Sequence, residues 1–248
     1  MDSFLYANNN FVKYSAEHYI SVIIFLIIGI LFIYIGKHKL KTINAKYNFI
    51  TYIMLFVLIT QIGKVLVKKY TGTFDITEDL PLHLCNMAPL FLFFAYYFRS
   101  RLAWSVFFLW IMAGTFQSLF TPTLHDSFPQ YEWWRYWIIH AWLVTGAFYG
   151  IVVFNYRMKF KDIFISLFWL NILSFTIMFI NMKIGANYMF MLGKPDTETM
   201  YDILSEWPYY ILELEPLALF LFGILYLPFF IVKKINDKKK VLSSQTKS

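Results

Sequence analysis

The chain has 248 residues, of which 59% are hydrophobic and 15% are charged, and its formal net charge at pH 7 is +7. A soluble domain carries about 25% charged residues, so this composition excludes an ordinary soluble protein. The 28 Phe, 18 Tyr and 8 Trp residues suit a protein whose solvent is largely lipid. We therefore interpret the chain as a polytopic membrane protein, in which the excess of basic residues does not indicate nucleic acid.

Seven segments are long and apolar enough to be membrane-spanning helices. A spanning helix needs roughly 17–25 mainly apolar residues, and segments of this length exclude the strands of a membrane barrel. The segments are residues 19–36, 49–67, 82–98, 102–120, 136–154, 163–182 and 208–232. We predict one all-α domain over residues 1–248, a seven-transmembrane-helix bundle, followed at residues 233–248 by a basic cytoplasmic tail.

Lysine and arginine are concentrated in alternate connections. The connections after the first, third and fifth segments, together with the tail, hold 15 of the 22 basic residues. Cytoplasmic loops of membrane proteins carry such an excess. We therefore expect the N-terminus outside and the C-terminus in the cytoplasm, in a multi-pass protein of the cell membrane. The outer connections are the longer ones, and long loops commonly carry function, so we expect the site to open outward.

Polar side chains within the expected helices gather in their outer halves. Ionisable groups inside a membrane are costly and usually face the bundle interior or a wet cavity. Each has a simpler reading: an interfacial histidine, a packing cysteine, an ion pair with Lys194 or Arg135, or an interhelical hydrogen bond. Their joint clustering nevertheless favours one shared site. The clustered residues are His83, Cys85, Asn86, Gln117, His140, Asn181, Glu213 and Glu215.

Cys85 is the only cysteine and the candidate nucleophile. His83 is two residues away, which is about 200° around a helix, so the two side chains point to different sides. A base for Cys85 must then come from another helix, and His140 lies at a similar expected depth. A thiolate beside an imidazole accepts acyl groups well. The sequence therefore predicts a Cys85–His140 pair.

Further residues are expected to support this pair. A carboxylate of the seventh helix, Glu213 or Glu215, would orient the imidazole. Side-chain amides, or backbone amides freed by Pro81 and Pro89, would donate to an oxyanion. The candidate amide side chains are those of Asn86, Gln117 and Asn187.

The same residue types permit a zinc site as an alternative. Thiolates and imidazoles are ordinary zinc ligands. No pair of histidines at positions i and i+4 supports this reading, so we expect neither a metal nor a cofactor. The possible ligands are His83, Cys85, His125 and His140.

Five blocks between residues 80 and 210 resemble the YwaF-type family of bacterial integral membrane proteins. The members of that family are seven-span proteins. The family is similar, at a distance, to a eukaryotic transmembrane acyltransferase that moves fatty acyl chains between phospholipids through a cysteine. This chain departs from the pattern at Asn86, where many members carry Asp. The blocks are residues 80–85, 117–122, His140, 187–195 and 207–210.

The resemblance implies acyl transfer between membrane lipids, with Cys85 as the nucleophile and His140 as its base. The expected partners are membrane lipids, with a phospholipid or lysophospholipid as substrate. The alternative is a non-enzymatic transporter or receptor-like protein that binds a small solute in the same pocket; a third reading is an accessory subunit of a larger complex. Against a transporter, the sequence shows no inverted repeat. The residues expected to bind substrate are His83, Asn86, Gln117, Asn187, Tyr188, Lys194, Glu213 and Glu215.

Overall fold

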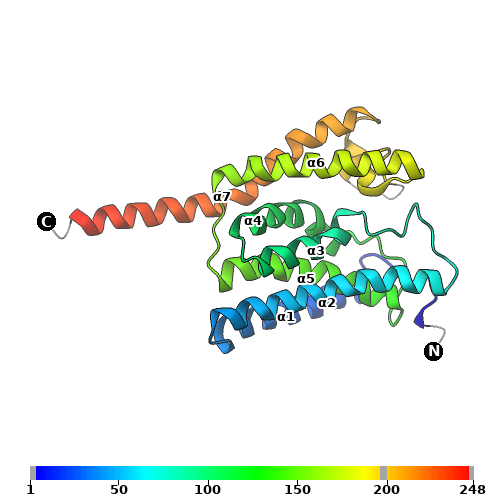
Figure 1. Cartoon of the computed structure of the whole chain (residues 1–248), viewed down its shortest axis with the longest axis horizontal. Helices are drawn as coiled ribbons and strands as arrows, with labels where there is room; N and C mark the ends of the chain where they lie inside the picture. Colours follow the sequence, from blue (N-terminus) through cyan, green and yellow to red (C-terminus); the bar gives the residue numbers. More distant parts are fainter. Residues whose placement is uncertain (1–3, 196–199, 246–248) are drawn as a thin grey trace.

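The computed structural model describes residues 4–195 and 200–245, and every regular element within them is helical. Seven α-helices follow one another along the chain (Figure 1). The all-α prediction is thereby confirmed. The helices are α1 (Ala16–Tyr34), α2 (Ile43–Tyr70), α3 (Leu84–Tyr97), α4 (Arg101–Trp110), α5 (Tyr131–Val153), α6 (Phe160–Ile184) and α7 (Tyr209–Gln245).

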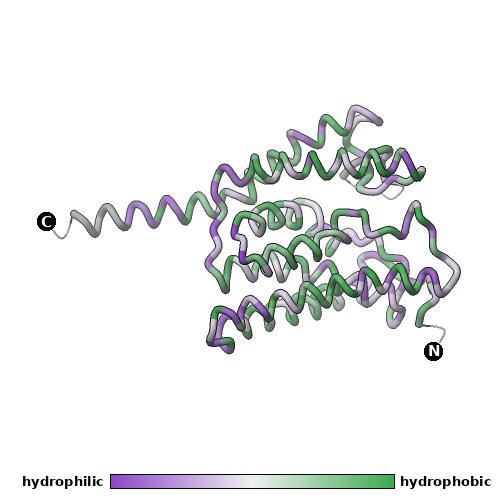
Figure 2. Tube along the Cα trace, in the orientation of Figure 1, coloured by the Kyte–Doolittle hydropathy of each residue, from purple (hydrophilic) through white to green (hydrophobic). Residues whose placement is uncertain are grey.

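The two ends of the bundle differ. Residues 37–42, 99–101 and 154–161 make short connections rich in Lys and Arg, and we call this the basic end. Residues 71–83, 120–130 and 185–208 make the longer connections at the opposite end, which we call the loop end. Figure 2 shows hydrophobic residues along most of each helix, with hydrophilic stretches at the basic end and on the projecting part of α7.

Short helices of other types extend or connect the α-helices. A π-helix, η3, continues α4 towards the loop end, where it packs against α3 and α5. Such π-helical turns are rare and occur frequently at functional sites. The short helices are η2 (Ile35–Lys39), η3 (Ile111–Thr115), η4 (Phe116–Leu119), η5 (Tyr188–Phe190) and η6 (Met200–Ile203).

Within the described residues, six helical segments are long and apolar enough to cross a membrane, which makes this a membrane protein. The sequence predicts seven, and α3 is the exception because it has only 14 residues. At 1.5 Å per residue α3 is about 21 Å long, against a hydrocarbon core of about 30 Å. Its expected first residues belong instead to the preceding connection, where the Leu80 N–H donates to the Tyr188 hydroxyl at 2.9 Å.

Helix α5 begins at Tyr131, five residues before the predicted start. The prediction excluded Arg135 from the membrane helix because of its charge. In the structure this charge is satisfied inside the bundle, since Arg135 pairs with Glu132 at 2.6 Å and donates to Gln61 at 3.1 Å. His140 therefore lies about two and a half turns into the helix, where one turn was expected.

Helix α7 runs past residue 232, where a separate tail was expected, and continues to Gln245. Its C-terminal part projects beyond the other helices at the basic end (Figure 1). Lys233, Lys234, Lys238 and Lys239 are exposed on this part of the helix, and lysine is a good helix former, so the basic segment continues α7.

Helix α5 is the central helix, packing on α1, α2, α3 and η3, and most of its residues are buried. Glycines bring its neighbours close. A Cβ atom added to Gly150 would overlap the indole nitrogen of Trp104. Trp104 is fully buried and donates from that nitrogen to the Ala147 carbonyl at 3.0 Å. Gly150 therefore sets the distance between α4 and α5.

We expect Gly150→Ala to lower the melting temperature of the purified protein, because Trp104 has no free space to move into. Overpacking of this kind costs about 1–3 kcal/mol, which corresponds to roughly 3–10 °C for a chain of this size. Gly223→Ala in α7 is the matched control, since nothing lies within 4 Å of the added carbon, and it should leave the melting temperature unchanged or slightly higher. Wild-type melting of Gly150→Ala would contradict the close packing.

Helices α6 and α7 form a layer on one side of the bundle. The Trp110 indole nitrogen of α4 donates to the Ser166 carbonyl of α6 at 3.2 Å. Helix α7 packs on α6 and η3, and the Asn171 amide of α6 donates to Glu215 of α7 at 3.1 Å. Most apolar side chains of these two helices are exposed, as expected for surfaces that face lipid.

Candidate functional site

Cys85 is the second residue of α3, at the loop end of the bundle. The residue is half-buried, and its thiol donates to the Asn86 side-chain oxygen at 3.8 Å. The backbone N–H groups of Cys85 and Asn86 lie beside the sulfur. In the first turn of a helix such groups lack i−4 partners inside the helix, so they are available to a negative charge at this position.

Pro89 lies inside α3, four residues after Cys85. A proline has no N–H, so the group left without its helical partner is the Cys85 carbonyl. The expectation that the prolines free backbone amides is therefore wrong for Pro89. The amides near the sulfur come from the first turn of α3 itself.

Two cations from other helices act electrostatically on Cys85. They are Arg135 of α5 and Lys64 of α2. Each is also paired with a carboxylate: Arg135 with Glu132 at 2.6 Å, and Lys64 with Asp79 at 2.9 Å. The side chains of both pairs are largely shielded from solvent.

His140 is buried in α5, and its orientation is set by α5 itself. Its Nδ1 atom lies 2.7 Å from the Tyr136 carbonyl oxygen, and the two rings are tilted with centroids 4.1 Å apart. A carbonyl oxygen only accepts hydrogen bonds, so Nδ1 carries the proton. In the neutral imidazole Nε2 then has a free lone pair, which is what a general base needs.

The structure does not join Cys85 and His140 by a hydrogen bond. Within the described residues the thiol bonds to Asn86 and the imidazole bonds to Tyr136. Arg135, however, acts electrostatically on both side chains, and Tyr136 acts on Cys85. The two candidate catalytic residues therefore have Arg135 in common as an electrostatic neighbour.

The carboxylates of α7 do not orient His140. Glu213 accepts hydrogen bonds from the backbone N–H of Ser205, at 2.8 Å, and from its hydroxyl. Glu215 accepts from Asn171. Because α7 packs on α6 and η3, its carboxylates bond within that layer. We predicted that Glu213 or Glu215 orients His140, but in the structure the imidazole is bonded to the Tyr136 carbonyl instead.

The connection between α6 and α7 covers the start of α3. The Met189 N–H donates to His83 Nδ1 at 3.3 Å, and the His83 and Tyr188 rings meet edge to face at 5.2 Å. The Tyr188 hydroxyl donates to the Ile76 carbonyl at 2.7 Å and accepts from the Leu80 N–H. Burial raises the pKa of Tyr188, so the hydroxyl keeps its proton and holds the segment before Cys85.

Three other predicted substrate-binding residues lie elsewhere at the loop end. The Asn187 amide donates to the Gly193 carbonyl at 2.8 Å, which shapes its own turn. Lys194 pairs with Glu206 at 3.1 Å. The simpler reading of the sequence was an ion pair between Lys194 and a glutamate of the seventh helix. Gln117 is exposed on η4. Within the part of the chain that the structure describes, none of the three bonds to Cys85, Arg135 or His140.

Other residues of the cluster were not predicted as site residues. Gln61 is buried in α2 and accepts from Arg135. Its spacing of three from Lys64 places both side chains on one helix face, a signal that was present in the sequence. Two buried oxygens, Thr115 Oγ1 and Glu132 Oε1, have no hydrogen-bond partner among the described residues. Unsatisfied buried oxygens of this kind mark places where a ligand or water bonds.

The residues of the zinc alternative do not converge. Within residues 4–195 and 200–245, no three His, Cys, Asp or Glu side chains gather closely enough to hold a metal ion. His83 bonds to Met189, His140 bonds to Tyr136, and His125 is exposed.

Comparisons with known proteins complete this description. Searches of curated proteins and of solved structures gave no match. A family model, described as the TMEM164 family, matches residues 13–226. This range includes the whole of α1 to α6 and the first half of α7. Cys85, Arg135 and His140 all lie within it. The chain therefore belongs to the TMEM164 family of transmembrane proteins.

Proposed function

We propose that this protein transfers fatty acyl chains between membrane lipids through a thioester at Cys85. The observation that carries the proposal is the setting of Cys85: it lies in the first turn of α3, where backbone N–H groups lie beside the sulfur, and Arg135 and Lys64 act on it electrostatically. His140 shares Arg135 as a neighbour and has a free Nε2 lone pair. In the proposed orientation the loop end faces outward from the cell membrane, because the basic end stays in the cytoplasm.

In the first half of the reaction Cys85 takes the acyl group. Nε2 of His140 accepts the thiol proton, and the sulfur attacks the ester carbonyl carbon of a phospholipid. The backbone N–H groups of the first turn of α3 stabilise the oxyanion. The ester C–O bond then breaks, His140 returns the proton to the leaving oxygen, and a lysophospholipid departs. Cys85 is left as a thioester.

In the second half a different lysolipid receives the chain. Its hydroxyl gives a proton to His140 Nε2 and attacks the thioester carbonyl carbon. The C–S bond breaks, and the thiolate recovers its proton from His140. Both halves require the imidazole to come within hydrogen-bond reach of the sulfur, directly or through one water, and such contacts often tighten only when substrate is bound.

The direct test is a covalent adduct on the protein. Wild-type protein in phosphatidylcholine vesicles carrying a radiolabelled acyl chain should acquire a label that neutral hydroxylamine releases, because hydroxylamine cleaves thioesters. Cys85→Ser should acquire no hydroxylamine-labile label, and since Cys85 is the only cysteine the assignment is unambiguous. Equal melting temperatures would show that both proteins are folded. No labile adduct on wild type with phosphatidylcholine, phosphatidylethanolamine or phosphatidylglycerol would overturn the proposal.

A second candidate is a non-enzymatic transporter or receptor-like protein that binds a small polar solute at the same cluster. Glu132, which pairs with Arg135, favours it, because its second carboxylate oxygen has no hydrogen-bond partner among the described residues and a polar solute would satisfy it. Solute binding would then persist in Cys85→Ser, and labelled lipid would leave no adduct on either protein.

A further inference from the structure

A long apolar groove lies between α4 and α6, away from Cys85, with α3 forming part of its wall. Its volume is about 440 Å³, within the range of about 300–1,000 Å³ that ligand pockets occupy. Its few polar side chains include Ser100 at one end and Thr176 at the other. The apolar lining includes Phe91, Val106, Trp110, Ile165, Trp169 and Leu173.

The groove opens to the surroundings of the bundle. Among its lining residues, Leu102 is 38% exposed, Ile172 is 42% exposed and Trp169 is 51% exposed. In a membrane protein these side chains meet lipid. An apolar groove in hydrocarbon does not attract water, and an empty one would lose dispersion contacts along its walls. Its natural occupant is therefore an acyl chain.

The length of the groove matches one leaflet. On α6 it extends from Ile165 to Thr176, which is about 16 Å at 1.5 Å per residue. The hydrocarbon core of a bilayer is about 30 Å thick, so the groove covers about half of it. The groove begins at Ser100, at the basic end. The chain that fits belongs to a lipid of the leaflet on that side.

The end of the groove at Ser100 suits an anionic headgroup. Lys161 is exposed and lies four residues before Ile165, so it occupies the same face of α6 one turn closer to the basic end. Ser100 Oγ accepts the Ala103 N–H at 3.1 Å, which leaves its hydroxyl hydrogen to donate. Arg101 is already committed to Asp162 at 2.5 Å. Lys161 and Ser100 are thus the groups available to a phosphate.

We propose that this groove binds one acyl chain of an anionic phospholipid, with the phosphate beside Lys161 and Ser100. The site lies at the opposite end of the bundle from Cys85 and does not depend on the proposed acyl transfer. Cys85→Ser should bind this lipid as wild type does, so the two proposals fail separately.

Native mass spectrometry of protein released from bilayers of phosphatidylglycerol and phosphatidylcholine tests the groove. Wild type should retain one phospholipid, and Ala103→Trp, which fills the groove, should retain at least fivefold less. Thr176→Trp blocks the other end from an exposed position that tolerates a large side chain, so it tests the groove even if Ala103→Trp does not fold. Ile59→Trp, on the exposed face of α2, is the matched control and should retain the lipid.

Lys161→Glu tests the headgroup. A lysine near an anionic lipid contributes about 1 kcal/mol, so wild type should prefer phosphatidylglycerol to phosphatidylcholine roughly fivefold, and Lys161→Glu should lose this preference. Undiminished retention in a folded Ala103→Trp or Thr176→Trp, or equal loss in Ile59→Trp, would overturn the groove as the site. An unchanged lipid preference in Lys161→Glu would overturn the assigned headgroup position.

Discussion

His140→Gln should slow the acylation of Cys85 by about 10²- to 10⁴-fold, the usual contribution of a positioned general base. The substitution removes an imidazole that shares Arg135 with Cys85 as an electrostatic neighbour. A glutamine side chain can still donate a hydrogen bond to the Tyr136 carbonyl, which bonds the ring in the wild type. The measurement is the initial rate of hydroxylamine-labile labelling of purified protein by a radiolabelled phospholipid.

The matched control is His38→Gln. His38 is exposed at the basic end, in η2, far along the bundle from Cys85. It should label at the wild-type rate, and a melting curve should show that His140→Gln is folded. Wild-type labelling by a folded His140→Gln protein would remove His140 from the mechanism and leave Cys85 to another base.

Asp162→Asn should destabilise the protein by about 3 kcal/mol, the lower end of what breaking a buried ion pair costs. Asp162 is fully buried and accepts from the Arg101 guanidinium at 2.5 and 3.2 Å and from the Lys159 N–H at 2.8 Å. Asparagine leaves Arg101 without a counter-charge and loosens α6 from α4. The melting temperature in detergent should fall by roughly 6–12 °C.

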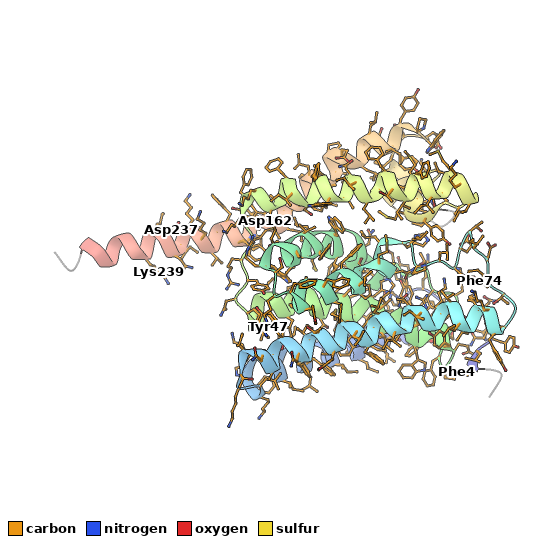
Figure 3. All side chains as sticks on the ribbon, viewed as in Figure 1. Phe4, Tyr47, Phe74, Asp162, Asp237 and Lys239 are labelled. Carbon is orange, nitrogen blue, oxygen red and sulfur yellow. The ribbon has the colours of Figure 1, made fainter. Side chains whose placement is uncertain are left out.

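Asp237→Asn provides the comparison for this loss of charge. Figure 3 shows Asp162 at the basic end of the bundle and Asp237 on the projecting part of α7. Asp237 is exposed, so its substitution should leave the melting temperature within about 1 °C, as for most surface changes. Equal melting of both variants would mean that the Arg101–Asp162 pair contributes nothing measurable.

The helical class followed from composition because long apolar runs have few other solutions in lipid. The helix ends were harder to predict, since they depend on partners distant in sequence. Arg135 lies inside α5 only because Glu132 and Gln61 accept its hydrogen bonds. The segment before α3 is held by Tyr188, whose hydroxyl accepts a hydrogen bond from the Leu80 N–H, 108 residues away in the chain. The hydropathy of neighbouring residues in the sequence predicts neither of these long-range hydrogen bonds.

The candidate site was likewise predictable in part: the depth of its residues along their helices was, but their partners were not. Depth along the helices predicted that Cys85 and His140 lie towards the same end, and Arg135 acts electrostatically on both. Which helices are neighbours was not predictable from depth. Glu213 has the expected depth but bonds to Ser205, because α7 packs on α6 and η3. The role of the Tyr136 carbonyl is invisible in sequence, since every residue has one.

The central position of α5 has a consequence for how the protein is made. This helix carries Arg135 and Glu132 into the bundle as an ion pair, Arg135 also donates to Gln61 of α2, and the helix packs on α1, α2 and α3. Those three helices precede α5 in the chain and leave the ribosome first. The membrane therefore already holds the partners of α5 when it is inserted, so its charged turn enters a partly assembled protein and not bare lipid. The order of the helices along the chain is itself an assembly sequence.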